Sequence, residues 1–113
     1  MHANIIIRTL NEGKWLPLCL ERLEKQTFQD FYVSIIDSGS TDNTLSIAAA
    51  YPRLAKSISS IEQYTPGLAI NISAEQVSSD YIIVLSAHCV PISDEWLSNF
   101  ISYMESNPKL QAA

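Results

Sequence analysis

The chain has 113 residues, 47% of them hydrophobic and 17% charged, which is the size and balance of one globular domain rather than of a disordered segment. Its net charge is −5 and it has only 7 Lys and Arg residues, so it lacks the basic surface with which proteins neutralise nucleic-acid phosphates. No apolar run reaches the roughly 18 residues that a transmembrane segment needs, and residues 1–10 do not resemble a secretory signal. We therefore expect a cytoplasmic domain, and membrane association of a longer parent chain stays open.

Segments with strand and helix patterns alternate along the chain. Short runs of β-branched and other apolar residues predict strands at residues 3–7, 31–36, 56–61 and 81–85. Apolar stripes at helical spacing predict helices at residues 14–26, 44–50, 68–77 and 94–105, the last of them capped by Ser93. Residues 110–113 could begin another strand. The alternation predicts an α/β fold with a mostly parallel sheet and helices on both faces.

Three polar segments directly follow predicted strands, at residues 8–11, 37–42 and 86–91. Because ligands of open parallel sheets bind beyond the carboxyl ends of the strands, we expect these segments to converge on one site. Asp37 ends a buried strand, where a carboxylate needs partners. It accepts hydrogen bonds either from its own loop or from the base or ribose of a ligand. Gly39 allows positive φ angles and the close approach of a ligand.

Other polar residues have less specific signals. Ser40, Thr41 and Asp42 are interpreted as helix-capping residues rather than ligand-binding ones. His88 follows the most strand-like run, and it either binds a metal ion or a phosphate or has only a structural role. His2, beside the start of the chain, is expected to have no role. The glycine-rich motifs of dinucleotide-binding and P-loop proteins are absent from the sequence.

Five ordered segments together resemble family 2 glycosyltransferases of the GT-A fold. Ile7-Arg8-Thr9-Leu10-Asn11 is similar to the family's I-P-T-Y-N segment, and Ile35 to Thr44 is similar to V-V-D-D-G-S-T-D-x-T. The remaining matches are a loose one at residues 20–31, Gly67 and Asn71 in G-x-x-x-A-x-N, and residues 81–97, which align with the D-x-D element and the following P-x-x-x-x-W-L. The form S-A-H-x-V-P resembles a rhamnosyltransferase-like branch.

The resemblance implies that residues 1–113 are the Rossmann-like, nucleotide-sugar-binding part of a glycosyltransferase, truncated before the acceptor-binding part. Such an enzyme transfers sugar from a nucleoside-diphosphate sugar, with inversion, to a glycan or a lipid-linked saccharide. The nucleotide-binding residues are then Thr9, Asn11, Asp37, Gly39 and Ser86. The catalytic general base is expected outside this chain.

The resemblance also implies a divalent cation, manganese or magnesium, that bridges the diphosphate. However, Ser86, Ala87 and His88 occupy the D-x-D positions, so both acidic residues are lost and His88 stands at the metal-binding position. This loss favours one alternative, a non-catalytic nucleotide-sugar-binding module. A receiver-like signalling domain is a third alternative, but it would need an acidic cluster and a strand-end lysine that the sequence lacks.

Overall fold

The computed structural model describes residues 2–87 and 90–106. In these residues, strands and helices alternate in the order β1 (Ala3–Thr9), α1 (Leu16–Glu24), β2 (Phe31–Asp37), α2 (Thr44–Ala48), β3 (Lys56–Ser60), α3 (Pro66–Gln76), β4 (Tyr81–Ser86) and α4 (Trp96–Ser106). All strand pairs are parallel, and the sheet order is β3-β2-β1-β4. The predicted α/β class with a parallel sheet is confirmed.

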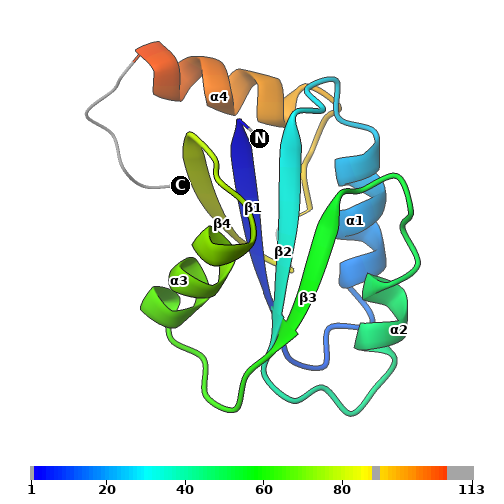
Figure 1. Cartoon of the computed structure of the whole chain (residues 1–113). Coiled ribbons are helices and arrows are strands. Elements are labelled where there is room, and N and C mark those ends of the chain that lie inside the picture. The colour runs from blue at the N-terminus through cyan, green and yellow to red at the C-terminus, as the bar shows by residue number, and fades with distance from the viewer. Residues whose placement is uncertain (1, 88–89, 107–113) are drawn as a thin grey trace.

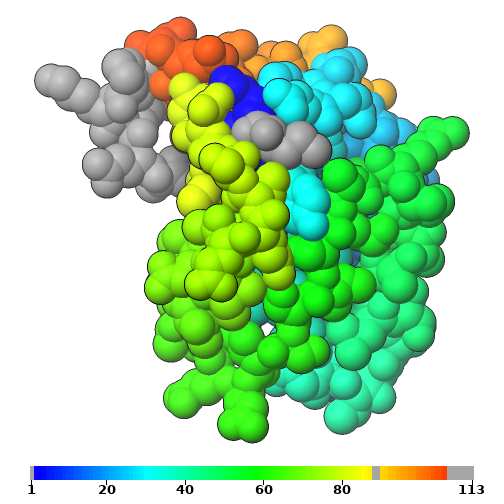
Figure 2. Space-filling view, viewed as in Figure 1, coloured from blue at the N-terminus to red at the C-terminus, as the bar shows by residue number. Residues whose placement is uncertain are grey.

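Helices cover both faces of the sheet (Figure 1). On one face, Ile5 and Ile7 of β1 pack in a core with buried residues of α1, α2 and α4. On the other face, Ile6 packs with Ile36 and with Ala69 of α3. Side chains alternate between the faces of a strand, so an apolar run such as that of β1 is buried from both sides. In the space-filling view, the α3 region (light green) lies over its face of the sheet and α4 (orange) runs along the top (Figure 2).

The strand order places a topological switch point between β1 and β4. The chain adds β2 and then β3 on one side of β1, and the crossover through α3 returns it to place β4 on the other side. Crevices at such points, outside the carboxyl ends of the strands, are the usual ligand sites of open α/β sheets. The same ends carry the polar segments that the sequence predicts to form a site.

Three strands are longer than the sequence patterns predict, and β2 is so by one residue, Asp37. Arg8 and Thr9 belong to β1, because they pair in register with Ile36 and Asp37 of β2. Ser86 is the last residue of β4 and pairs with Arg8. The first and third polar segments therefore begin on the sheet itself, which holds their backbone in the ladder.

The starts of three helices also differ from the prediction. The helix predicted from residue 14 is α1, which begins at Leu16. The predicted start of the third helix at residue 68 is wrong, since α3 begins at Pro66 and Thr65 accepts a hydrogen bond from the Leu68 N–H at 3.1 Å. Proline suits a first helical position because its missing N–H would have no partner there.

The predicted start of the last helix at residue 94 is also wrong, since α4 begins at Trp96. Gln26 Oε1 accepts from the Leu97 N–H at 2.9 Å. The side chain of Gln26 thus satisfies a free N–H in the first turn of α4, a role that the sequence pattern assigns to Ser93. The strand expected at residues 110–113 lies outside the described residues.

Within residues 2–87 and 90–106, no helix combines the length and the apolar character that crossing a bilayer requires.

Candidate functional site at the carboxyl ends of β1, β2 and β4

Asp37 ends β2 with a buried carboxylate that four donors surround. Its residue is 1% exposed, so the side chain has little access to water. Oδ1 accepts from the hydroxyls of Thr9 at 2.7 Å and Ser40 at 2.5 Å. Oδ2 accepts from the backbone N–H groups of Gly39 at 3.1 Å and Ser40 at 2.9 Å. Since an ionised carboxylate offers about four lone-pair positions, this set of donors matches its capacity.

These contacts favour the charged form of Asp37. Burial by itself raises the pKa of the carboxyl, but the hydrogen bonds from Ser40, Thr9 and Gly39 outweigh it and hold the pKa below its usual value. The sequence leaves two roles open for Asp37, as an acceptor from its own loop or from a ligand. In the structure, Asp37 accepts from its own loop and from Thr9. A donor group of a ligand would share or displace the Ser40 hydroxyl.

Asn11 joins the segment after β1 to the loop after β2. Its backbone has a φ angle of 54°, which is uncommon outside glycine but which asparagine tolerates. Asn11 Oδ1 accepts from the N–H of Thr41 at 2.8 Å and from the N–H of Asp42 at 3.3 Å, while the Asn11 N–H donates to Ser40 Oγ at 2.9 Å. The two loops are therefore one hydrogen-bonded unit.

Asp42 joins the same two segments and lies at the start of α2. Its carboxylate accepts from the N–H of Gly13 at 3.1 Å and from the N–H of Thr44 at 2.9 Å. The interpretation of Asp42 as a helix cap is wrong in position, because the N-cap of α2 is Asn43, which makes no side-chain capping hydrogen bond. Asp42 lies one residue earlier and accepts from the N–H of the first helical residue, Thr44.

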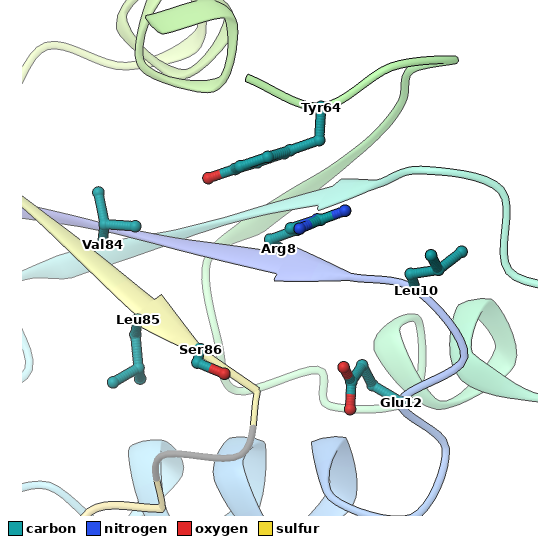
Figure 3. A pocket seen from close by; sticks show the side chains of 7 residues that line it. All are labelled: Arg8, Leu10, Glu12, Tyr64, Val84, Leu85 and Ser86. Atoms are coloured by element: carbon teal, nitrogen blue, oxygen red, sulfur yellow. The ribbon is translucent and has the colours of Figure 1, made fainter. Parts of the chain in front are cut away.

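A pocket of about 410 Å³ opens at the switch point between β1 and β4 (Figure 3). This volume lies within the range of small-molecule sites. Residues from the ends of both strands and from the loop before α3 line it: Arg8, Leu10, Glu12, Tyr64, Val84, Leu85 and Ser86. The side chains of Arg8, Val84 and Ser86 lie on the same face of the sheet as α3, but beyond the part of that face that α3 covers. This uncovered part forms the pocket, and Val84 in it is 41% exposed.

Arg8 and Tyr64 are functional candidates that the sequence reasoning did not single out. The Arg8 guanidinium lies 4.5 Å from the centre of the Tyr64 ring, a cation–π contact. Arg8 could have been found from its place in the first polar segment. Tyr64 has no such signal, because only the fold brings residue 64 to the ends of β1 and β4.

The predicted site residues divide into two groups. Ser86 lines the pocket. Thr9, Asn11, Asp37 and Gly39 form the adjacent hydrogen-bonded network and are not among the residues that line it. Because Thr9 follows Arg8 and Asn11 lies between Leu10 and Glu12, the network holds the backbone that carries three pocket side chains.

The predicted metal ligand, His88, lies outside the described residues. Within residues 2–87 and 90–106, no three His, Cys, Asp or Glu side chains gather in a way that could hold a metal ion. Ser86 brings an uncharged hydroxyl to the end of β4. The divalent cation therefore stays a prediction from the sequence.

Comparisons with known proteins agree with the resemblance seen in the sequence. A family model described as glycosyl transferase family 2 matches residues 4–113. A PGL/p-HBAD biosynthesis glycosyltransferase of Mycobacterium bovis is 34% identical over 87 residues, covering 74% of this chain and 34% of its own length. The O-antigen chain rhamnosyltransferase RfbN of Salmonella typhimurium is 26% identical over 113 residues, covering 99% of this chain and 36% of its own length.

Solved structures show the same fold. The S. aureus TarS 1–349 structure in complex with UDP-GlcNAc superposes with a TM-score of 0.79 at 27% identity, covering 94% of this chain and 32% of that chain. The chain thus spans about a third of the length of the proteins it resembles.

Proposed function

The chain belongs to glycosyl transferase family 2, and on that premise we propose that it binds a nucleoside-diphosphate sugar at the pocket between β1 and β4. The observation that carries the proposal is the location of this pocket, at the switch point of a parallel sheet and beside the Asp37 network. Thr9, Asn11, Asp37, Gly39 and Ser86 are proposed to bind or to position the nucleotide.

The geometry supports a division of labour among these residues. Asp37 holds Thr9 and the Gly39–Ser40 backbone in one arrangement before a ligand binds. A preformed site loses less conformational entropy on binding than a flexible one. Ser86 and Arg8, which pair across β4 and β1, present polar groups to the pocket itself.

We propose further that the sugar is transferred, with inversion, to a glycan or lipid-linked saccharide by the protein of which this domain is the donor-binding part. The general base is expected outside this chain, so residues 1–113 alone are expected to transfer no sugar. Acceptor-dependent glycosylation by this chain alone would contradict that assignment.

Calorimetric titration of the chain with UDP-, dTDP- and GDP-sugars, with and without manganese, tests donor binding. The complex of the similar TarS structure with UDP-GlcNAc makes uridine nucleotides the first choice. Residues 1–113 alone are expected to bind at least one nucleotide sugar, and only weakly. Absence of binding by the folded chain across this panel would overturn the proposal.

A pair of variants tests the location of the site. Val84→Trp should fill the pocket and abolish binding, because Val84 lines it. Leu18→Trp is the matched control, since Leu18 is 47% exposed on α1 and does not line the pocket. Equal affinities of the two variants would place the ligand elsewhere.

A further inference from the structure

The pocket contains a guanidinium group whose neighbours on the sheet carry no charge. In the ladder, Arg8 pairs with Ile36 on one side and with Ser86 on the other. Among the described residues, no acidic side chain forms an ion pair with Arg8. Arg8 is also one of only 7 Lys and Arg residues in a chain of net charge −5. Its positive charge is thus a local feature of the pocket rather than part of a basic surface.

Tyr64 holds this guanidinium in place. The Arg8 Cζ atom lies 4.5 Å from the centre of the Tyr64 ring, and the close-up shows the guanidinium beneath the ring (Figure 3). Contact with the ring occupies a face of the planar group and leaves its N–H edge free to donate. A guanidinium presented in this way suits the paired oxygens of phosphate groups.

The opposite wall of the pocket has a different character. Glu12 lines the same pocket and its side chain extends toward it (Figure 3). An anion would avoid this carboxylate, whereas sugar or ribose hydroxyls could donate to it. A ligand that carries both a negative group and hydroxyl groups matches the two walls together, and a nucleoside-diphosphate sugar is such a ligand.

We infer that Arg8, held against Tyr64, binds the diphosphate of the donor directly. The inference rests on the proposed donor-binding function and adds a residue and a contact to it. The acidic residues that would hold a bridging cation are absent from the described end of β4, where Ser86 stands. Arg8 supplies positive charge to the same pocket from the neighbouring strand, so diphosphate binding does not depend on an added divalent ion.

The experiment compares three variants with the unmodified chain. Arg8→Ala removes the charge, and Arg8→Lys keeps the charge but loses the planar set of donors. Arg53→Ala is the matched control, because Arg53 is an exposed arginine just before β3, at the opposite edge of the sheet. Affinities for UDP, dTDP and GDP and for the corresponding nucleosides are measured by calorimetry in EDTA and again with manganese. The Arg8 Nε–H resonance is followed by NMR during titration with inorganic pyrophosphate.

In EDTA, Arg8→Ala should bind the preferred nucleoside diphosphate roughly tenfold to a hundredfold more weakly than the unmodified chain. Arg8→Lys should lie between them, and Arg53→Ala should not differ from the unmodified chain. Affinity for the nucleoside should be unchanged in every variant, and pyrophosphate should shift the Arg8 resonance.

Two outcomes overturn the inference while the proposed function stands. One is a folded Arg8→Ala variant that keeps its diphosphate affinity, and the other is binding by the unmodified chain only when manganese is present. Failure of the unmodified chain to bind any nucleoside diphosphate under either condition would reject the proposed function itself.

Discussion

The hydroxyl of Thr9 donates to Asp37 Oδ1 across 2.7 Å, and these two residues are also register partners at the last step of the β1–β2 ladder. Both residues are buried, at 0% and 1% exposure. The side-chain hydrogen bond therefore continues the strand pairing beyond the backbone and fixes the direction in which the two following loops leave the sheet.

Acid should weaken the fold through Asp37. Because the hydrogen bonds outweigh burial and hold its pKa below the usual value in the folded chain, the unfolded chain binds more protons once the pH falls toward about 4. The contribution of Asp37 to the free energy of unfolding should thus be present in full well above pH 4. It should be lost as the pH falls through the pKa that Asp37 has in the folded chain. Urea unfolding from pH 2.5 to 7 measures this slope.

Asp37→Asn should remove part of the slope and lower stability at pH 7, since an amide cannot accept from all four donors. The exposed Asp30, replaced by asparagine, is the control and should retain the slope. Asp42, whose pKa is also lowered by its hydrogen bonds with Thr44, will leave some acid dependence in place. An unchanged pH profile in Asp37→Asn would contradict the role given to its carboxylate.

Two substitutions at Asn11 should separate backbone strain from the loss of an acceptor. Asn11→Gly tolerates the φ angle of 54° but leaves the N–H groups of Thr41 and Asp42 without Asn11 Oδ1. Asn11→Ala loses the acceptor and also strains the backbone. Both should unfold at lower urea concentration than the unmodified chain, with the alanine variant less stable than the glycine variant by about 1 kcal/mol. Equal stability of the two variants would show that backbone strain at residue 11 does not contribute to the stability of the fold.

Gly39 and Gly67 form a second matched pair. A Cβ at either residue meets no atom within 4 Å, so packing does not distinguish them. Gly39 has a φ angle of 110°, which side-chain-bearing residues rarely adopt, whereas Gly67 lies in the first turn of α3. Gly39→Ala should cost about 1–3 kcal/mol of unfolding free energy. Gly67→Ala should be neutral or stabilising by up to about 1 kcal/mol. A thermal melt that ranks them in the opposite order would contradict this reading.

The sequence predicts the sheet better than it predicts the site. Apolar runs mark the strands because both faces of β1 are buried, a demand that acts directly on residue type. Helix starts were less predictable. In the first turn of α4, the Leu97 N–H donates to the side chain of Gln26, which lies 71 positions earlier in the sequence. The contact of Tyr64 with Arg8 was unpredictable for the same reason, because it exists only once the loop between β3 and α3 lies over β1.

His2 shows the same limit at the amino ends of β1 and β4. Its place beside the chain start predicts no role. In the fold, its Nδ1 lies 2.9 Å from Asp80 Oδ2 and its ring packs edge-on against Tyr81, at 5.2 Å between centroids. Pairing of β1 with β4 brings residues 2 and 80 together. The residues around His2 in the sequence cannot predict these contacts, because the contacts depend on which strands are neighbours in the sheet.

The role of His88 is predicted from the sequence alone, and it has two versions: ligation of a divalent ion or direct pairing with the diphosphate. The pH dependence of donor affinity distinguishes them. Should His88 ligate a divalent ion, donor affinity in manganese should fall as the pH drops through about 6.5, since a protonated imidazole cannot ligate. Should protonated His88 pair with the diphosphate instead, affinity should rise over the same range. The Arg8 guanidinium stays charged throughout, so its contribution should be constant with pH.

Donor affinity is therefore measured from pH 5.5 to 8, with and without manganese, in the unmodified chain and in the His88→Ala and Arg8→Ala variants. A nucleotide sugar is the suitable ligand, because its diphosphate diester does not titrate in this range and the protein's groups alone set the profile. Arg8→Ala should displace the whole curve by a constant factor, whereas His88→Ala should flatten it. Curves of His88→Ala that superimpose on those of the unmodified chain would remove His88 from the site and leave Arg8 as the cationic group proposed to face the diphosphate.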